Sequence, residues 1–181
     1  MIIGVTGTNG AGKGTVVDYL VAKGFTHYSV REFLIEEIKR RGMEVNRPSM
    51  REVANDLRAS KEPEFIVDTL FTRATKQGGD AVIESIRALR EAEFLKKHGA
   101  HLFAVDANRH IRYERVVLRA SHTDAVDFDT WVMEEEREWH NEAAHDMNVP
   151  GVMKLADHTF HNDGTLEELH AQIDAVLAKL A

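Results

Sequence analysis

The sequence of 181 residues contains no cysteine. Disulfide bonds, thiolate metal sites and cysteine nucleophiles are therefore excluded. Long apolar runs are missing too, since none approaches the roughly 20 residues that a membrane-spanning helix needs. The chain starts directly with a predicted strand instead of a basic segment and a cleavage site. We therefore expect no membrane segment, no signal peptide and a cytoplasmic location.

Basic residues are in deficit. Lysine and arginine together number 23 against 30 acidic residues, a formal net charge of −7. General binding of nucleic acids relies on a basic surface, so we expect none. A local basic cleft can still bind a small polyanion, because the local field governs such binding. The ten histidines are scattered along the chain, which favours surface positions over a metal centre.

A glycine-rich segment at residues 7–15 lies between an apolar run and a stretch with helical spacing. Such a turn gathers backbone N–H groups in one concavity, and the helix N-terminus adds positive charge. Lys13 supplies a mobile cation for the β- and γ-phosphates. The segment predicts the binding of a nucleoside triphosphate, which we take to be ATP. The predicted cradle consists of Gly7, Asn9, Gly10, Ala11, Gly12, Lys13, Gly14 and Thr15.

The segment departs from the strict phosphate-binding pattern at one position. That pattern has Ser or Thr directly after the lysine, where the hydroxyl reaches Mg²⁺. Here Gly14 holds that position, and the hydroxyl comes one residue later, at Thr15. We expect Mg²⁺ beside Thr15 and Glu84, with contact through water.

Helical and strand patterns alternate along the whole chain, which predicts one α/β domain over residues 1–181 with a mainly parallel sheet. The predicted strands cover residues 1–5, 25–29, 81–84, 102–106 and 159–161. The predicted helices reach to about residue 23 and then cover about 31–41, 50–60, 65–77, 89–98, 111–118, 129–143 and 166–180. Residues 47–49 are expected to form a loop and a helix cap, and residues 121–128 a loop.

Glu84 ends the third predicted strand, and Arg87 follows three residues later. Ligands bind at the carboxyl edge of such sheets, so both side chains are expected beside the glycine-rich loop. A bound triphosphate can donate a phosphoryl group to a second molecule, the acceptor. In that case Glu84 would hold a metal-bound water, and Arg87 would bind a phosphate group of the acceptor with two parallel hydrogen bonds. The alternative is a strand-terminal acid and a surface arginine.

Three further residues are candidates for the acceptor site. Ser29 and Arg31 lie at the end of the second predicted strand, and Arg58 lies in the helical region behind it. The alternative for Arg58 is an ion pair with Glu52 or Asp56.

Arginines also follow the fourth strand, which ends at Asp106. Spacings of three and four place Arg112, Arg115 and Arg119 along one helix face. An acidic helix follows. One interpretation is a lid that pivots after Arg119 and excludes water, with Arg115 and Arg119 as catalytic residues and Arg137 as a weaker candidate. The alternative is a solvated helix whose arginines pair with the neighbouring acids.

The segment 162–165, Asn-Asp-Gly-Thr, follows the last strand. Thr165 and Glu168 have the spacing of a capping box, which predicts that the last helix begins there.

The chain resembles nucleoside monophosphate kinase-like P-loop proteins, and among these the small adenylate-kinase-like proteins. The residues that carry the resemblance lie at 2–15, 29–42, 82–87, 111–119 and 156–169. It implies a P-loop NTPase fold with three α/β/α layers and a five-stranded sheet, an acceptor-binding insertion at about 30–77 and a lid at about 119–150. It also implies that Asn162 and Gly164 rest against the adenine ring.

The resemblance implies transfer of the ATP γ-phosphoryl group to a small phosphorylated acceptor, with nucleoside and deoxynucleoside monophosphates as first choice. Two departures leave the acceptor open. Glu84-Ser85-Ile86-Arg87 replaces the Asp-Gly-X-Pro-Arg pattern of adenylate kinases, and the Asp-X-Asp signature of dephospho-coenzyme A kinase is absent. Dephospho-coenzyme A kinase and a regulatory ATPase acting on a protein partner remain alternatives. We expect a monomer or a homodimer.

Overall fold

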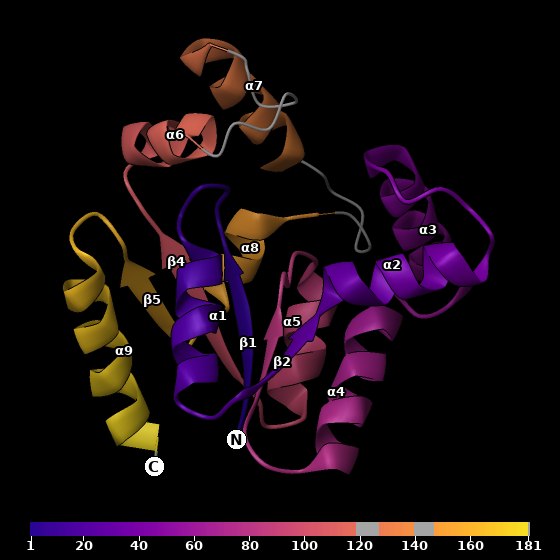
Figure 1. Ribbon diagram of the computed structural model, residues 1–181, viewed down its shortest axis with the longest axis horizontal. Helices are drawn as coiled ribbons and strands as arrows, with labels where there is room; N and C mark the ends of the chain where they lie inside the picture. The colour runs from indigo at the N-terminus through magenta and orange to yellow at the C-terminus, as the bar shows by residue number, and fades with distance from the viewer. Residues whose placement is uncertain (119–126, 140–146, 181) are drawn as a thin grey trace.

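The computed structural model describes residues 1–118, 127–139 and 147–180, without the side chains of Arg47, Arg51, Glu134, Arg137 and Glu138. Five strands form one parallel sheet in the order β2-β3-β1-β4-β5 (Figure 1). The strands are β1 Ile2–Gly7, β2 Thr26–Ser29, β3 Ala81–Glu84, β4 His101–Asp106 and β5 His158–His161.

Helices connect these strands and cover both faces of the sheet. They are α1 Lys13–Ala22, α2 Val30–Arg40, α3 Arg47–Ser60, α4 Phe65–Gln77, α5 Leu89–Lys97, α6 Arg109–Leu118, α7 Phe128–Trp139, α8 Val149–Lys154 and α9 Leu166–Leu180. The predicted five-stranded parallel α/β fold is thus confirmed. Within the described ranges, no helix is both long and apolar enough to cross a membrane.

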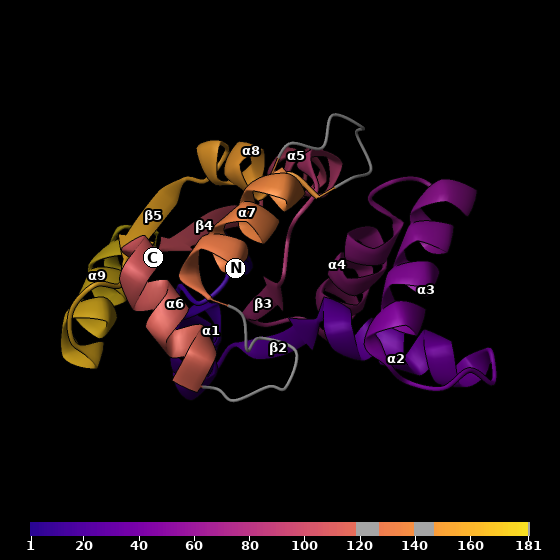
Figure 2. The ribbon, with the colours of Figure 1, turned by 90° about the horizontal axis from the view of Figure 1, so that it is seen from above.

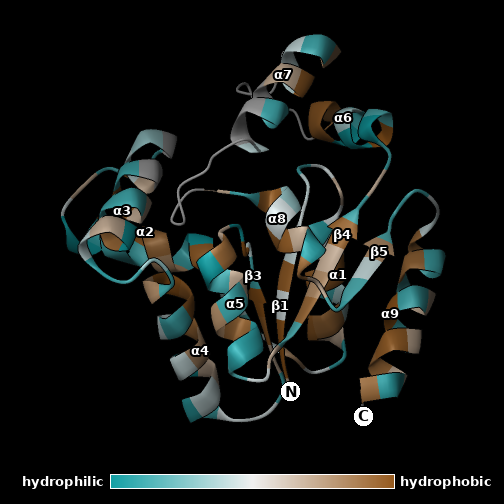
Figure 3. Cartoon of the chain, turned by 180° about the vertical axis from the view of Figure 1, so that it is seen from behind, coloured by the Kyte–Doolittle hydropathy of each residue, from teal (hydrophilic) through white to brown (hydrophobic). Residues whose placement is uncertain are grey.

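The strands of the sheet are largely hydrophobic (Figure 3), and alternation of their side chains divides the core into two layers. Ile3 and Val5 of β1 pack with helices α1 and α9 on one face. Gly4 faces the other way, where a Cβ atom would lie 2.6 Å from a methyl group of Leu95 in α5. Helices α4, α5 and α8 cover that second face, which the view from above shows (Figure 2).

The register of the strands brings three chain segments to one level at the carboxyl edge of the sheet. Val5 of β1 pairs with Glu84 of β3, and Glu84 pairs with Ser29 of β2. The glycine-rich loop leaves β1 two residues further on, next to β4. Because the order of connection reverses at β1, this edge is where ligands bind in open α/β sheets.

Apart from shifts of one or two residues at the ends of elements, three local predictions differ from the structure. Helix α3 begins at Arg47 and not at residue 50, because Asn46 caps it: the Asn46 side chain accepts from the Ser49 amide at 2.9 Å. Helix α7 begins at Phe128, which was expected to lie in the preceding loop. Helix α8 was not predicted, because its six residues include a proline and a glycine.

Candidate functional site

The glycine-rich loop is shaped by positions at which a side chain does not fit. Gly7 and Gly10 have φ values of +144° and +80°. A Cβ atom on Gly7 would lie 2.1 Å from the carbonyl oxygen of Val105, and one on Gly10 would lie 2.4 Å from that of Arg112. Glycine is therefore required at both positions by conformation and by close backbone approach. The loop is held in shape before any ligand binds.

Helix α1 starts at the end of this loop with an open N-terminus. Gly12 is the N-cap, with φ +96° and no side-chain hydrogen bond to the first-turn amides. Gly14 has nothing within 4 Å of the position that a Cβ atom would occupy. The first turn therefore presents backbone donors and open space, which is the arrangement that binds phosphate groups at helix N-termini.

Lys13 folds back over the loop that precedes it. Its Nζ donates to the carbonyl oxygens of Gly7, at 2.9 Å, and Thr8, at 2.8 Å. A phosphate in the concavity would exchange these neutral acceptors for charged oxygens, with which hydrogen bonds are about twice as strong. The ammonium group of Lys13 thus lies beside the glycine-rich loop, and its role toward phosphate stays a prediction.

Asn162 supports the loop from β5. Its buried Nδ2 donates to the carbonyl oxygen of Ala11 at 2.8 Å, and its backbone amide donates to that of Asp106 at 2.8 Å. The resemblance implies that Asn162 and Gly164, which is exposed, contact the adenine ring. This contact stays a prediction. The capping box of α9 is confirmed by two hydrogen bonds between Thr165 and Glu168.

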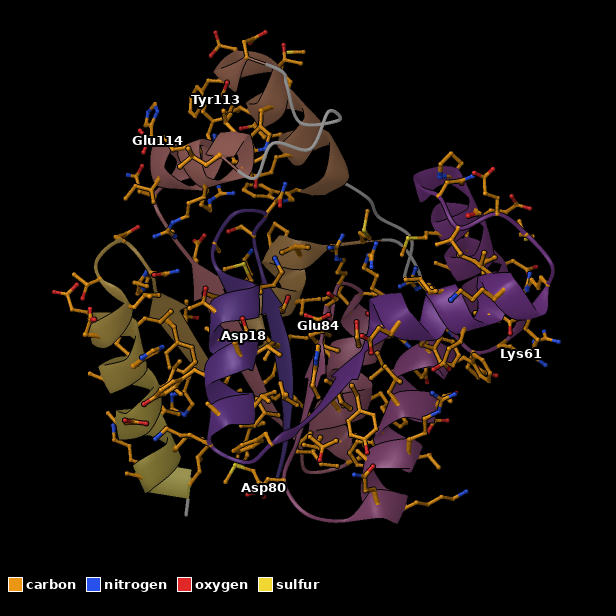
Figure 4. All side chains as sticks on the ribbon, viewed as in Figure 1. Asp18, Lys61, Asp80, Glu84, Tyr113 and Glu114 are labelled. Atoms are coloured by element: carbon orange, nitrogen blue, oxygen red, sulfur yellow. The ribbon has the colours of Figure 1, made fainter. Side chains whose placement is uncertain are left out.

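Glu84 ends β3 at the carboxyl edge of the sheet, between β2 and β1 (Figure 4). One of its carboxylate oxygens accepts from the Ser29 hydroxyl at 2.8 Å and lies 3.6 Å from Nε2 of His27. The contact with His27 lowers the pKa of Glu84, and the Ser29 hydroxyl and the charge of Lys13 act in the same direction against the effect of burial. Glu84 is therefore ionised at neutral pH. Ser29 also caps α2 by accepting from the Glu32 amide.

Asp106 supplies a second carboxylate beside the loop. Its Oδ1 accepts from the Thr8 hydroxyl at 2.7 Å and from the Ala107 amide at 2.9 Å. The carboxylates of Glu84 and Asp106 and the hydroxyl of Thr15 on α1 could each offer an oxygen atom as a metal ligand. Mg²⁺ prefers such ligands and commonly takes one or two carboxylates together with phosphate oxygens and water.

The segment after Glu84 is held by one buried carboxylate. Glu91 of α5 is fully buried, and its Oε2 accepts from the backbone amides of Arg87, at 3.0 Å, and Ala88, at 3.1 Å. Its Oε1 accepts from Nη2 of Arg58 at 3.1 Å. The expected alternative for Arg58, a pair with Glu52 or Asp56, is therefore wrong, because the guanidinium is drawn to the buried acid. Asp56 pairs with Arg41.

Among the acceptor candidates, Ser29 contacts Glu84 and Arg58 contacts Glu91, whereas no such contact joins the side chains of Arg87 and Arg31 to these acids within the described residues. The Arg87 side chain is exposed, with Nη1 3.7 Å from the sulfur of Met147. Nε of Arg58 is buried without a hydrogen-bond partner among the described residues. Exposed Arg31 lies in the first turn of α2, two residues after Ser29.

Helix α6 carries Arg112 and Arg115, two of the three arginines expected along one helix face before the lid, and their surroundings differ. Arg112 is buried and pairs through both η-nitrogens with Glu135 of α7. Nη1 of Arg115 is buried without a hydrogen-bond partner in the described part of the chain. Arg119 and the side chain of Arg137 lie outside the described residues, as do two parts of the expected lid, 119–126 and 140–146.

Sequence reasoning missed three residues at this site: His27, Glu91 and Glu135. His27 lies two residues before Ser29 on β2, so the alternation of a strand places both side chains on one face. Glu91 occupies the third position of α5, where a carboxylate commonly accepts from the preceding backbone amides. These two signals were present, whereas nothing local identifies Glu135 as the partner of Arg112.

Comparisons with known proteins agree with this geometry. Residues 3–148 match the model of a family described as an AAA domain. The UPF0200 protein of Thermococcus gammatolerans is 27% identical over 187 residues, which cover 99% of this chain and 95% of the relative.

Solved structures give the same picture. The structure of TT1252 from Thermus thermophilus is similar, with a TM-score of 0.58 and 25% identity over 100% of this chain and 98% of the other. A shikimate kinase from Bacteroides thetaiotaomicron has a TM-score of 0.59 and 12% identity over 98% of both chains. The second likeness identifies the arrangement of sheet and helices as the P-loop kinase fold. Since the family model matches most of its length, the chain belongs to the AAA domain family.

Proposed function

We propose that this protein transfers the γ-phosphoryl group of ATP, with Mg²⁺, to a small phosphorylated acceptor, most simply a nucleoside or deoxynucleoside monophosphate. One observation carries the proposal. The strand register brings the glycine-rich loop after β1 close to the level of Glu84 on β3 and Ser29 on β2, and Glu91, which binds the backbone after Glu84, also pairs with Arg58. Donor and acceptor sites thus share one edge of the sheet.

On the donor side, the loop amides and Lys13 would bind the β- and γ-phosphates. Arg115 and Arg119 would stabilise the charge on the transferring group, and Nη1 of Arg115, buried without a hydrogen-bond partner among the described residues, supports this role. Phosphoryl transfer depends mainly on positioning and charge neutralisation, so no covalent role is needed for a side chain. Mg²⁺, held near Thr15, Glu84 and Asp106, would neutralise phosphate charge.

On the acceptor side, Arg87 and Arg31 are exposed at the carboxyl edge and would bind the acceptor phosphate. Arg58 would contribute through Nε while Glu91 holds its other end. A phosphate acceptor is already nucleophilic and needs no general base. The fixed carboxylate of Glu84 would therefore organise water around the metal.

A hydroxyl acceptor is the second candidate. A hydroxyl acceptor needs a general base, and the carboxylate of Glu84 could serve as one. Its Oε1 already accepts from the Ser29 hydroxyl and lies beside His27, so this oxygen is occupied, which favours the phosphate acceptor. Dephospho-coenzyme A and shikimate represent the hydroxyl class, the latter because one structural neighbour is a shikimate kinase.

An acceptor screen tests the proposal. ADP formation from Mg-ATP would be measured with each nucleoside and deoxynucleoside monophosphate, dephospho-coenzyme A and shikimate. Strong stimulation by one monophosphate is expected. If only a hydroxyl acceptor stimulates ADP formation, the second candidate function replaces the first. ADP formation that no acceptor changes would contradict both and indicate a regulatory ATPase.

A further inference from the structure

Arg112 joins three segments that are far apart in the sequence. It lies on α6 with 3% of its surface exposed. Its Nε donates to the carbonyl oxygen of Ala107 and its Nη1 to that of Asn9 in the phosphate-binding loop, both at 3.0 Å. Nη2 donates to Oε2 of Glu135 on α7 at 3.0 Å, and Nη1 contacts the other oxygen of the same carboxylate. One planar guanidinium thus connects the loop to α7.

The contact with Asn9 also fixes the direction of the neighbouring backbone N–H, that of Gly10. The carbonyl of Asn9 and the N–H of Gly10 belong to one planar trans peptide, so they point in opposite directions. An arginine that holds the carbonyl directs the Gly10 N–H away from itself. The backbone of Arg112 is close as well, since its carbonyl oxygen would lie 2.4 Å from a Cβ atom on Gly10. Rotation of this peptide therefore requires a shift of Arg112.

The contact with Glu135 is equally restrictive. Glu135 is only 7% exposed, so the pair is shielded from water on both sides. Removing one partner of a buried pair leaves an uncompensated charge, which disfavours independent movement of the two helices. Aromatic contacts join α6 and α7 further: His110 stacks on Phe128 with ring centroids 4.3 Å apart, and Tyr113 packs edge-on against Phe128 at 5.3 Å.

Helix α7 carries a natural reporter of this contact. The sequence has two tryptophans, Trp131 and Trp139, and both lie in α7. Trp131 is 5% exposed, and the guanidinium carbon of Arg112 lies 5.1 Å from its ring centroid. Tryptophan emission therefore reports on α7 and, at Trp131, on the position of Arg112.

We propose that Arg112 is a positioning residue that couples occupation of the phosphate-binding loop to the position of α7 through Asn9 and Glu135. A triphosphate that binds the Gly10 N–H pulls on the Asn9 peptide, Arg112 follows the carbonyl, and Glu135 carries α7 with it. The inference rests on the proposed function only in that the loop must bind a nucleotide.

The experiment uses the W139F protein, in which Trp131 is the single tryptophan. Magnesium with a non-hydrolysable ATP analogue is titrated, while binding is measured independently by calorimetry. We expect a change in Trp131 emission whose midpoint equals the calorimetric Kd. In E135Q, the analogue should still bind, but roughly tenfold more weakly, the size of a typical coupling between sites, and the emission change should be largely lost.

Two further variants separate coupling from folding. R112K keeps the charge, but a lysine cannot span the Asn9 carbonyl and both Glu135 oxygens, so the fold should persist while the emission change is lost. E136Q is the matched control, because Glu136 lies next in the helix but is exposed and pairs with Arg109 at 3.2 Å. It should retain the full emission change. Circular dichroism establishes that each variant is folded.

The outcomes distinguish this inference from the proposed function. Calorimetric binding to the W139F protein without any change in Trp131 emission overturns the coupling alone, and this result needs no further variant. An undiminished response in folded E135Q and R112K overturns it as well. If calorimetry detects no binding of the analogue to the unmodified protein, the proposed function fails and the coupling fails with it.

Discussion

The donor and acceptor sides of the candidate site are held in place by different means. On the donor side, the backbone does most of the positioning, because Gly7 and Gly10 fit against neighbouring carbonyl groups. On the acceptor side, side chains do it: Glu91 holds the Arg87 segment and binds Arg58, 33 positions away in the sequence. A glycine-shaped loop is specified locally, whereas an ion-pair framework is specified by distant residues. Under the proposed function, a few substitutions would therefore change acceptor recognition while donor binding is retained.

The largest expected effect comes from the donor side. In Lys13→Ala, ADP formation in the presence of the acceptor should fall by about a thousandfold, since preorganised charge at the transferring group is worth roughly 4 kcal/mol. Lys23→Ala is the control, because Lys23 lies at the end of α1 and pairs with Asp174. Near-normal turnover of the Lys13 variant would rule out its catalytic role.

The acceptor side should respond most strongly to Glu91→Gln. The substitution keeps the volume but leaves Arg58 without its carboxylate partner, which should lower the free energy of unfolding by about 3 kcal/mol. It should also raise KM for the acceptor while the Kd for nucleotide stays constant. Glu93→Gln on the same helix is the control, because Glu93 is exposed and lies 3.8 Å from Arg90. Equal effects of both variants on stability would contradict the framework described for Glu91.

A glycine substitution measures how far the donor loop depends on close approach. Gly10→Ala should lower the free energy of unfolding by about 2 kcal/mol, since the left-handed conformation is strained for alanine and the Arg112 carbonyl is close. Gly42→Ala introduces the same kind of strain, because Gly42 has a φ of +69°, but no atom lies within 4 Å of the added Cβ atom. Chemical denaturation of both variants isolates the contribution of the contact. No difference between them would mean that the loop relaxes freely.

The smallest effect is expected outside the site, at Glu37 of α2. Hydrogen bonds from Arg40 and Arg41 lower the pKa of Glu37 from 4.5 to about 2. A carboxylate with a lowered folded-state pKa stabilises the protein above its unfolded pKa and loses that contribution as the pH falls through the folded one. Glu37→Gln should therefore cost less than about 1 kcal/mol at pH 7, because the pairs are largely exposed. The difference should shrink below pH 4.5 and vanish only once the pH has fallen below about 2, and a constant difference in thermal melts would contradict the assignment.

The sequence predicted the fold and the donor loop because the signals for both are local. Alternating patterns identified all five strands, and the glycines with Lys13 identified the loop between β1 and α1, whose binding of phosphate stays a prediction. The acceptor framework was predicted only in part. Ser29, Glu84 and Arg87 could be placed because parallel strands end at one edge, but the partner of Arg58 could not. A single sequence gives no register between α3 and α5, and burial of Glu91 decides that pairing.

The central position of β1 has a consequence for hydrogen exchange. The strand is bonded to β3 on one side and to β4 on the other, so its amides are protected from both directions. Such amides exchange only when the whole domain unfolds, whereas a loop exchanges through local opening. The boundary between the slowest and the faster exchanging amides should therefore fall within a few residues of Gly7. The part of the chain proposed to bind phosphate is thus attached directly to the most persistent part of the molecule.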